Sequence, residues 1–180
     1  MKSIAPLAIV CLALCAAPLA CAQELIEGYT CCNLHYDKDW ISDANWRQLP
    51  SIPAGSKIKI TSYGWNNRAY AQIDGREMRI GHDYGRNEEK LEQYVAKLVV
   101  KKDPRAAIAR YPAKVRDAIK NGTVIPGMTR EQVIISVGYP PTHRTPSLDA
   151  PVWNLWASRA GRYEVHFNNK GVVEKIVGTP

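Results

Sequence analysis

Alternating polar and apolar positions between residues 56 and 82 predict a run of short strands. In "KIKITSYG" (57–64) lysines alternate with isoleucines, which is the pattern of a half-buried strand. The turn-forming "GWNN" follows, and then come "RAYAQI", the hairpin dipeptide "DG" and "REMRIG". Short strands joined by tight turns are typical of small barrels and curled sheets. We therefore expect an SH3-like β-rich module over residues 23–86.

The apolar pattern takes the period of a helix after residue 87. One stripe at helical spacing consists of Leu91, Tyr94, Val95 and Leu98. This stripe predicts a helical connector over residues 87–111. The next stretch, "YPAKVRDAIKNG", places a proline in a first helical turn and Asn-Gly at the end, so it predicts a second helix.

The stretch "VIPGMTREQVIISVGYPP" carries the clearest local signals in the chain. Thr129 and Gln132 form a predicted capping box, while Gly138 and the following prolines end the helix. Three strands should follow, in "VWNLWAS", "RYEVHFN" and "VVEKIVG". Residues 112–180 are thus predicted to form a module of two helices and a three-stranded antiparallel sheet. The predicted fold class of the whole chain is α+β.

The second half resembles the SmpA/OmlA family, which includes the small lipoprotein subunit of the outer-membrane β-barrel assembly machinery. The resemblance rests on "IKNGTVIPGMTREQVIISVGYPP", "VWNLW" and "YEVHFNNKGVVEKI". The matching positions are Gly127, Met128, Thr129, Val133, Gly138, Pro140, Trp153, Val165, Phe167 and Gly171. This resemblance implies an envelope protein without catalytic residues that acts as a scaffold. The same arrangement of elements also resembles β-lactamase-inhibitor proteins, so the fold alone does not determine the function.

Residues 1–22 have the pattern of a secretory signal peptide. Lys2 precedes the apolar run "IAPLAIVCLALCAAPLA", which ends in the small-residue site Ala20-Cys21-Ala22. We therefore expect export, with a location in the periplasm or at the outer membrane. Lipidation of Cys21 is the alternative, although Leu19 is misplaced for a lipoprotein processing site; acyl chains at Cys21 would anchor the protein in a membrane.

The chain is basic, with a formal net charge of +7, which favours partners that carry negative charge. Export makes nucleic acid an improbable partner, so we expect an envelope or outer-membrane protein, or anionic lipid headgroups or an envelope polymer. A candidate anionic-ligand face consists of Lys57, Lys59, Arg68, Arg76 and Arg79. A merely solvated basic surface is the alternative interpretation of these residues.

Two adjacent cysteines, Cys31 and Cys32, are the only cysteines after residue 22. Because an oxidising compartment favours disulfides, they are a candidate vicinal disulfide, which requires a turn since neighbouring strand residues face opposite sides. One buried thiol beside one exposed thiol is the other interpretation. Adjacent cysteines chelate zinc poorly, so a metal site with His35 and Asp37 is disfavoured. A cysteine nucleophile with His35 as its base is disfavoured as well.

Trp153 and Trp156 lie three residues apart on one predicted strand, so their side chains should face opposite sides. One should be core, and the other is a candidate partner surface. The polar run 82–86 is a second candidate site or a helix lead-in, and His143 and His166 are expected to be solvated. We expect no cofactor and no enzymatic activity. The alternatives are a thiol-, metal- or redox-dependent protein using Cys31, Cys32 and His35, and a protein inhibitor.

Overall fold

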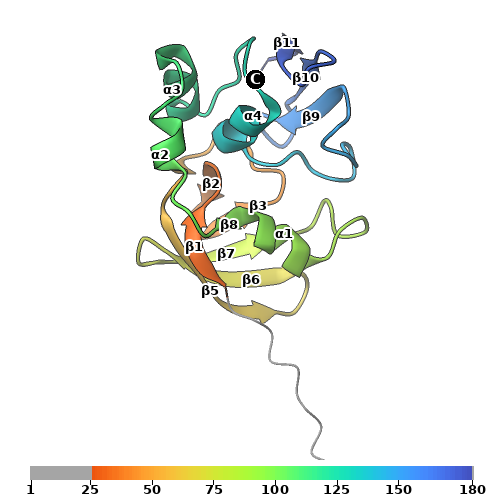
Figure 1. Cartoon of the computed structure of the whole chain (residues 1–180). Coiled ribbons are helices and arrows are strands. Elements are labelled where there is room, and N and C mark those ends of the chain that lie inside the picture. Colours follow the sequence, from red (N-terminus) through yellow and green to blue (C-terminus); the bar gives the residue numbers. More distant parts are fainter. Residues whose placement is uncertain (1–25, 180) are drawn as a thin grey trace, which may run out of the picture.

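A computed structural model of the chain describes residues 26–179 (Figure 1). The expected signal peptide and Cys21 lie outside these described residues. Within residues 26–179, no helix is long and apolar enough to cross a membrane.

A curled sheet of eight strands is formed between residues 27 and 100. Its strand order is β4-β2-β3-β7-β6-β5-β1-β8. The strands are β1 (Glu27–Thr30), β2 (Leu34–Asp37), β3 (Trp40–Ser42), β4 (Ser51–Ile52), β5 (Lys57–Gly64), β6 (Arg68–Ile73), β7 (Arg76–Gly81) and β8 (Val99–Val100). Neighbouring strands are antiparallel except β3 and β7, which run parallel. The predicted alternation is present in β5, where Ile58 and Ile60 are buried and Lys57 and Lys59 are exposed.

The helix α1 (Leu91–Leu98) packs its apolar stripe against the inner face of this curled sheet. Leu91, Tyr94, Val95 and Leu98 are all buried, as the spacing predicts. They share one hydrophobic cluster with the isoleucines of β5, β6 and β7. Figure 1 shows α1 in front of β6 and β7. The chain then returns through β8 to pair with β1.

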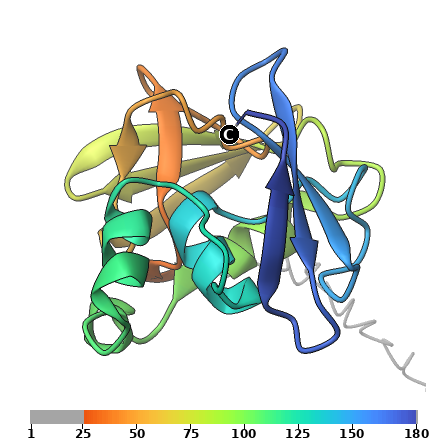
Figure 2. The same ribbon diagram turned by 90° about the horizontal axis from the view of Figure 1, so that it is seen from above.

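The remaining elements surround a second hydrophobic cluster. They are α2 (Arg105–Ile108), α3 (Ala113–Lys120), α4 (Arg130–Val137), β9 (Val152–Trp156), β10 (Arg162–Phe167) and β11 (Val173–Val177). The strands form an antiparallel sheet in the order β11-β10-β9. Figure 2 shows α4 between α3 and this small sheet. The fully buried Trp153 and Met128 belong to the cluster.

The predicted capping box of α4 is present. The Thr129 hydroxyl accepts a hydrogen bond from the Gln132 amide, and the Gln132 side chain accepts one from the Thr129 amide. The helix ends at Gly138, whose φ of 82° favours glycine. A Cβ at Gly138 would lie 2.5 Å from the Asn45 side-chain nitrogen, so glycine is also needed for close packing.

The predicted α+β fold class is wrong. Residues 26–179 are mostly β, with eleven strands and four short helices that make these described residues 18% helical. The first half is a large curled sheet rather than a small SH3-like module, because β8 returns after α1 and extends it. The two helices and the three-stranded antiparallel sheet expected after residue 112 are present as elements, but the described chain as a whole is mostly β and is not such a module. Local periodicity predicts elements but gives no information on such long-range pairing.

Buried asparagines join the curled sheet to α3 and α4. Asn33 donates to the carbonyls of Ile119 and Ser136 at 2.7 and 2.9 Å. The side-chain oxygen of Asn33 accepts from the Ala54 amide at 3.0 Å. Asn45 donates to the carbonyl of Val137 at 2.7 Å. Because unpaired buried polar groups are costly, these bonds fix how the sheet and the helices sit together.

Candidate partner-binding surface

The two tryptophans of β9 lie on opposite faces of the small sheet. Trp153 is fully buried, donates to the Leu148 carbonyl at 3.2 Å and packs against Phe167. Trp156 is half-buried on the other face. Trp153 is therefore part of the core and offers no surface to a partner. Trp156 remains the candidate contact residue.

Trp156 belongs to a connected group of surface side chains, which we call the Trp156 cluster: Trp46, Tyr84, His143, Trp156 and Arg159. Ring centroids are 5.6 Å apart for His143 and Trp156 and 5.8 Å apart for Tyr84 and His143. Trp46 packs edge-on against Tyr84 at 6.4 Å, and the Arg159 guanidinium lies 5.3 Å from the Trp46 ring. Tyr84 is 43% exposed. The cluster thus presents aromatic and arginine groups to solvent, the composition of binding hot spots.

The cluster is assembled from loops of both sheets. The loop after β3 bonds to the end of β9, since the amides of Arg47 and Gln48 donate to the carbonyls of Trp156 and Ala157 at 3.3 and 2.9 Å. The loop after β7 packs on the loop after α4, where the Thr142 hydroxyl lies 3.4 Å from the Gly85 carbonyl. These contacts position the rings of the cluster in the absence of a partner.

A buried ion pair supports the loop that carries Tyr84. One carboxylate oxygen of Asp43 accepts from the amides of Tyr84 and Gly85 at 3.0 and 2.9 Å. The same oxygen lies 3.0 Å from His82 Nδ1, in an ion pair whose atoms are not aligned for a good hydrogen bond. His82 Nε2 donates to the Glu89 carbonyl at 2.8 Å. Burial lowers the pKa of His82, but Asp43 and Glu89 outweigh this effect and the net shift is upward.

Exposed arginines surround the cluster. Arg162 lies directly across from Trp156 on β10, and Arg144 follows His143 in its loop. Together with Arg159 they are exposed, and none of the three forms an ion pair with a carboxylate in the described part of the chain. The cluster therefore has an aromatic centre and a basic rim.

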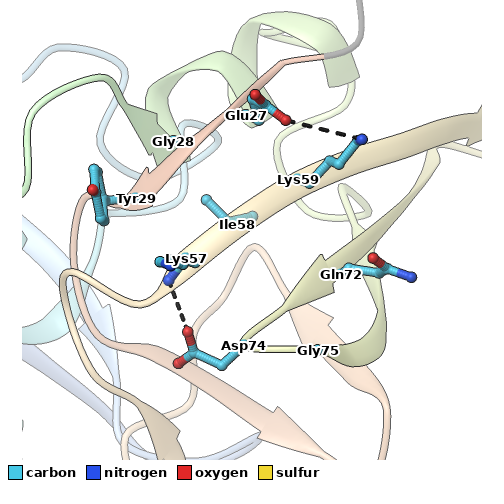
Figure 3. Close-up of a pocket in the computed structure, with 9 residues that line it drawn as sticks. All are labelled: Glu27, Gly28, Tyr29, Lys57, Ile58, Lys59, Gln72, Asp74 and Gly75. Atoms are coloured by element: carbon cyan, nitrogen blue, oxygen red, sulfur yellow. Dashed lines mark hydrogen bonds and ion pairs between the residues drawn. The ribbon is translucent and has the colours of Figure 1, made fainter.

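The five residues of the predicted anionic-ligand face have different surroundings in the structure. Figure 3 shows Lys57 and Lys59 in a hollow of about 500 Å³ that β1, β5 and β6 surround. Lys59 lies 4.0 Å from the Glu27 carboxylate, and the Lys57 amide donates to Asp74 at 2.9 Å. The acids Glu27 and Asp74 line the same hollow. The two lysines are thus matched by two acids, and the hollow carries no excess positive charge.

The three arginines of that face are engaged elsewhere. Arg68 and Arg79 both lie over the Trp40 ring, at 4.5 and 5.7 Å. Arg68 pairs with Asp83 at 2.8 Å, and Arg79 bonds Asp39 through two nitrogens. Arg76 instead lies 4.6 Å from the Tyr36 ring and donates to its hydroxyl at 3.2 Å. The structure does not gather the five predicted cations into one unpaired surface.

Both cysteines are buried free thiols in a bend between β1 and β2. The Cys31 side chain and burial raise the pKa of the Cys32 thiol well above its usual value. A thiol that remains protonated is a poor nucleophile. The vicinal disulfide is not formed in the structure and stays a prediction for the oxidising compartment, testable by counting free thiols.

His35 is buried apart from any ligand set. Its ring Nδ1 has no hydrogen-bond partner among the described residues, and burial lowers the pKa of His35 to about 4. No group of three His, Cys, Asp or Glu side chains in the described residues could hold a metal ion. The disfavoured metal set of Cys31, Cys32, His35 and Asp37 is thus not such a group in the described part of the chain.

A second hollow, of about 860 Å³, lies between α2, α4 and the loop after α4. Its apolar lining includes Ile134, Tyr139 and Leu148. Its charged lining is balanced between basic and acidic groups: Lys102, Arg110, Arg130, Asp103, Glu131 and Asp149. The hollow thus shows no preference for a partner of either charge.

The sequence predicts a contact role for one of Trp153 and Trp156 but not for the other residues of the Trp156 cluster. Tyr84 was considered only within the run 82–86, and His143 was expected to be solvated, whereas it is half-buried between two rings. These residues come from loops far apart in the chain, and no spacing rule connects them. The tendency of Trp, Tyr and Arg to form contact surfaces was the single usable signal.

No family model matches this chain, and neither the curated proteins nor the solved structures contain a significant match.

Proposed function

We propose that the chain is a non-enzymatic protein of the cell envelope that binds a partner protein through the Trp156 cluster, as a scaffold or assembly factor. The observation that carries this proposal is the connected series of half-exposed rings from both sheets, bordered by arginines that pair with no carboxylate within residues 26–179. Trp, Tyr and Arg provide most of the binding energy in protein interfaces. The leader-like residues 1–22 support an envelope location.

The basic rim defines the chemistry of the partner. Arg144, Arg159 and Arg162 are exposed and lack carboxylate partners among the described residues. Guanidinium groups bind carboxylates in two-point contacts, so the favoured partner is an acidic protein surface with an apolar centre. Complementary charge of this kind speeds association and weakens with salt.

Affinity capture from envelope extracts tests the proposal. The variant Tyr84→Ser with Arg159→Ser should fold normally, because both side chains are exposed and Asp43 holds the Tyr84 backbone rather than its ring. Its capture of the specific partner should fall roughly tenfold or more, as expected for loss of hot-spot contacts. The matched control Tyr70→Ser removes a tyrosine that is 40% exposed and should retain the partner.

Two results would count against this function. One is a correctly located, folded wild-type protein that captures no envelope protein. The other is equal capture by the wild-type protein, the double variant and the control, which would place the contact elsewhere.

A further inference from the structure

Trp65 is the most exposed large apolar side chain among the described residues. It is 95% exposed, whereas Tyr70 and Tyr84 are 40% and 43% exposed. It lies in the turn between β5 and β6, where Gly64 pairs with Arg68. Tryptophan is the largest apolar side chain and is usually well buried, so a tryptophan this exposed in the described structure is unusual.

The turn that carries Trp65 is rigid without any contribution from the indole. Asn66 and Asn67 have φ values of 60° and 55°, which asparagine tolerates well. The Arg68 guanidinium donates to the carbonyls of both asparagines at 2.7 and 3.1 Å. Its other contacts, with Asp83 and with the Trp40 ring, fix it to the sheet. Trp65 is thus held in an outward position by its neighbours.

The start of the described chain lies at the same end of the molecule as this turn. The Ile60 amide donates to the Ile26 carbonyl at 2.8 Å, so β1 begins beside the middle of β5, which then continues to the turn. In Figure 1 the start of β1 and the end of β5 lie at the lower end, away from the small sheet. The apolar run of residues 4–20 precedes Ile26 in the sequence.

We propose that the Trp65 turn is a membrane-surface anchor, with the indole inserted at the headgroup level of a lipid bilayer. Tryptophan prefers this interface because its ring is apolar and its N–H is polar. From Ile60 to Trp65 the strand extends about 17 Å, at about 3.3 Å per residue. The residues from Cys21 to Ile26 span at most about the same distance. A lipid on Cys21 would therefore let Trp65 reach the bilayer surface.

The charges beside the turn fit a surface contact that does not depend on anionic lipid. Arg86 and Lys90 line a hollow next to Tyr63 and Gly64, and Glu92 lines it as well. The two cations can reach headgroup phosphates, which zwitterionic lipids also carry. Because the local excess of positive charge is small, apolar insertion of Trp65 should dominate and binding should depend little on salt.

Quenching by brominated lipids tests this anchor. Protein produced with its own leader is mixed with phosphatidylcholine vesicles whose acyl chains carry bromine, which quenches tryptophan on contact. The wild-type emission should be quenched, and Trp65→Phe should lose that quenching while keeping its unfolding transition, since the side chain makes no core contact. The control Tyr70→Phe should be quenched like the wild type. This readout reports insertion of the indole itself, whether or not Cys21 carries lipid.

Equal quenching of wild type and Trp65→Phe, or no quenching of the wild type, would overturn the anchor. A third result would also overturn it: the wild-type emission is not quenched, and Trp65→Phe fails to capture a protein that the wild type captures. The turn would then be a protein contact.

Discussion

Burial of a single residue, His35, makes the free energy of unfolding depend on pH. His35 is 3% exposed, and within residues 26–179 its ring Nδ1 has no hydrogen-bond partner. Its backbone amide donates to Asn45 at 2.7 Å, so the residue is fixed at the junction with α4. Burial lowers the pKa of His35 from 6.5 to about 4. The folded protein therefore keeps this ring neutral where the unfolded chain protonates it.

The folded protein should become less stable as the pH decreases. Above about pH 6.5 His35 is neutral in both states, and below it only the unfolded chain binds the proton. Stability should therefore fall from about pH 6.5 towards pH 4, by roughly 3 kcal/mol from this group. Urea unfolding of wild type and His35→Gln across this range measures the effect. The variant should lose much of the slope; identical slopes for wild type and His35→Gln would contradict the assignment.

At the scale of elements, α4 is the part of the chain that local sequence predicts best. Thr129, Gln132 and Gly138 act within a few residues of one another, and the observed helix Arg130–Val137 carries the predicted capping box. The stripe of α1 was also predicted from its spacing. In contrast, β8 has only two residues, too few for a periodic pattern, and its pairing with β1 joins residues about seventy positions apart. Such a strand cannot be predicted from the sequence of its own few residues.

Removal of the cap measures its contribution to stability. Thr129→Ala leaves the Gln132 amide without its acceptor, so the free energy of unfolding should decrease by about 1 kcal/mol. The control Thr179→Ala alters an exposed threonine outside any helix or strand and should change little. Chemical denaturation of both variants checks this, and equal stabilities would show that the capping bond contributes nothing.

At the scale of the whole molecule, buried amides unite the curled sheet with the helices and so position the Trp156 cluster. Asn33 and Asn45 satisfy backbone carbonyls of α3 and α4. The sequence does not reveal this role, because an asparagine in a loop usually indicates a turn. The error in fold class has the same origin. Short local patterns predicted many elements, whereas their assembly depends on contacts between residues 86 to 103 positions apart.

Asn33→Ala tests this connection. The substitution removes three hydrogen bonds and leaves the Ile119 and Ser136 carbonyls without the Asn33 donor in a buried site. Stability should decrease by about 3 kcal/mol, because each orphaned buried group costs roughly 1–3 kcal/mol. Asn87→Ala, at an exposed position, is the control. A loss no larger than that of the control, measured by urea unfolding, would show that the junction does not depend on Asn33.

We propose that the Trp156 cluster binds a partner protein in the envelope. The most direct test of this proposal is photo-crosslinking in the producing cells, with a photoreactive residue placed at Tyr84 or, as the matched control, at Tyr70. These positions have similar exposure, 43% and 40%, but only Tyr84 belongs to the cluster. We expect a protein adduct of one defined mass from position 84 and none of that mass from position 70. No adduct at position 84, or the same adduct from both positions, would contradict the proposal.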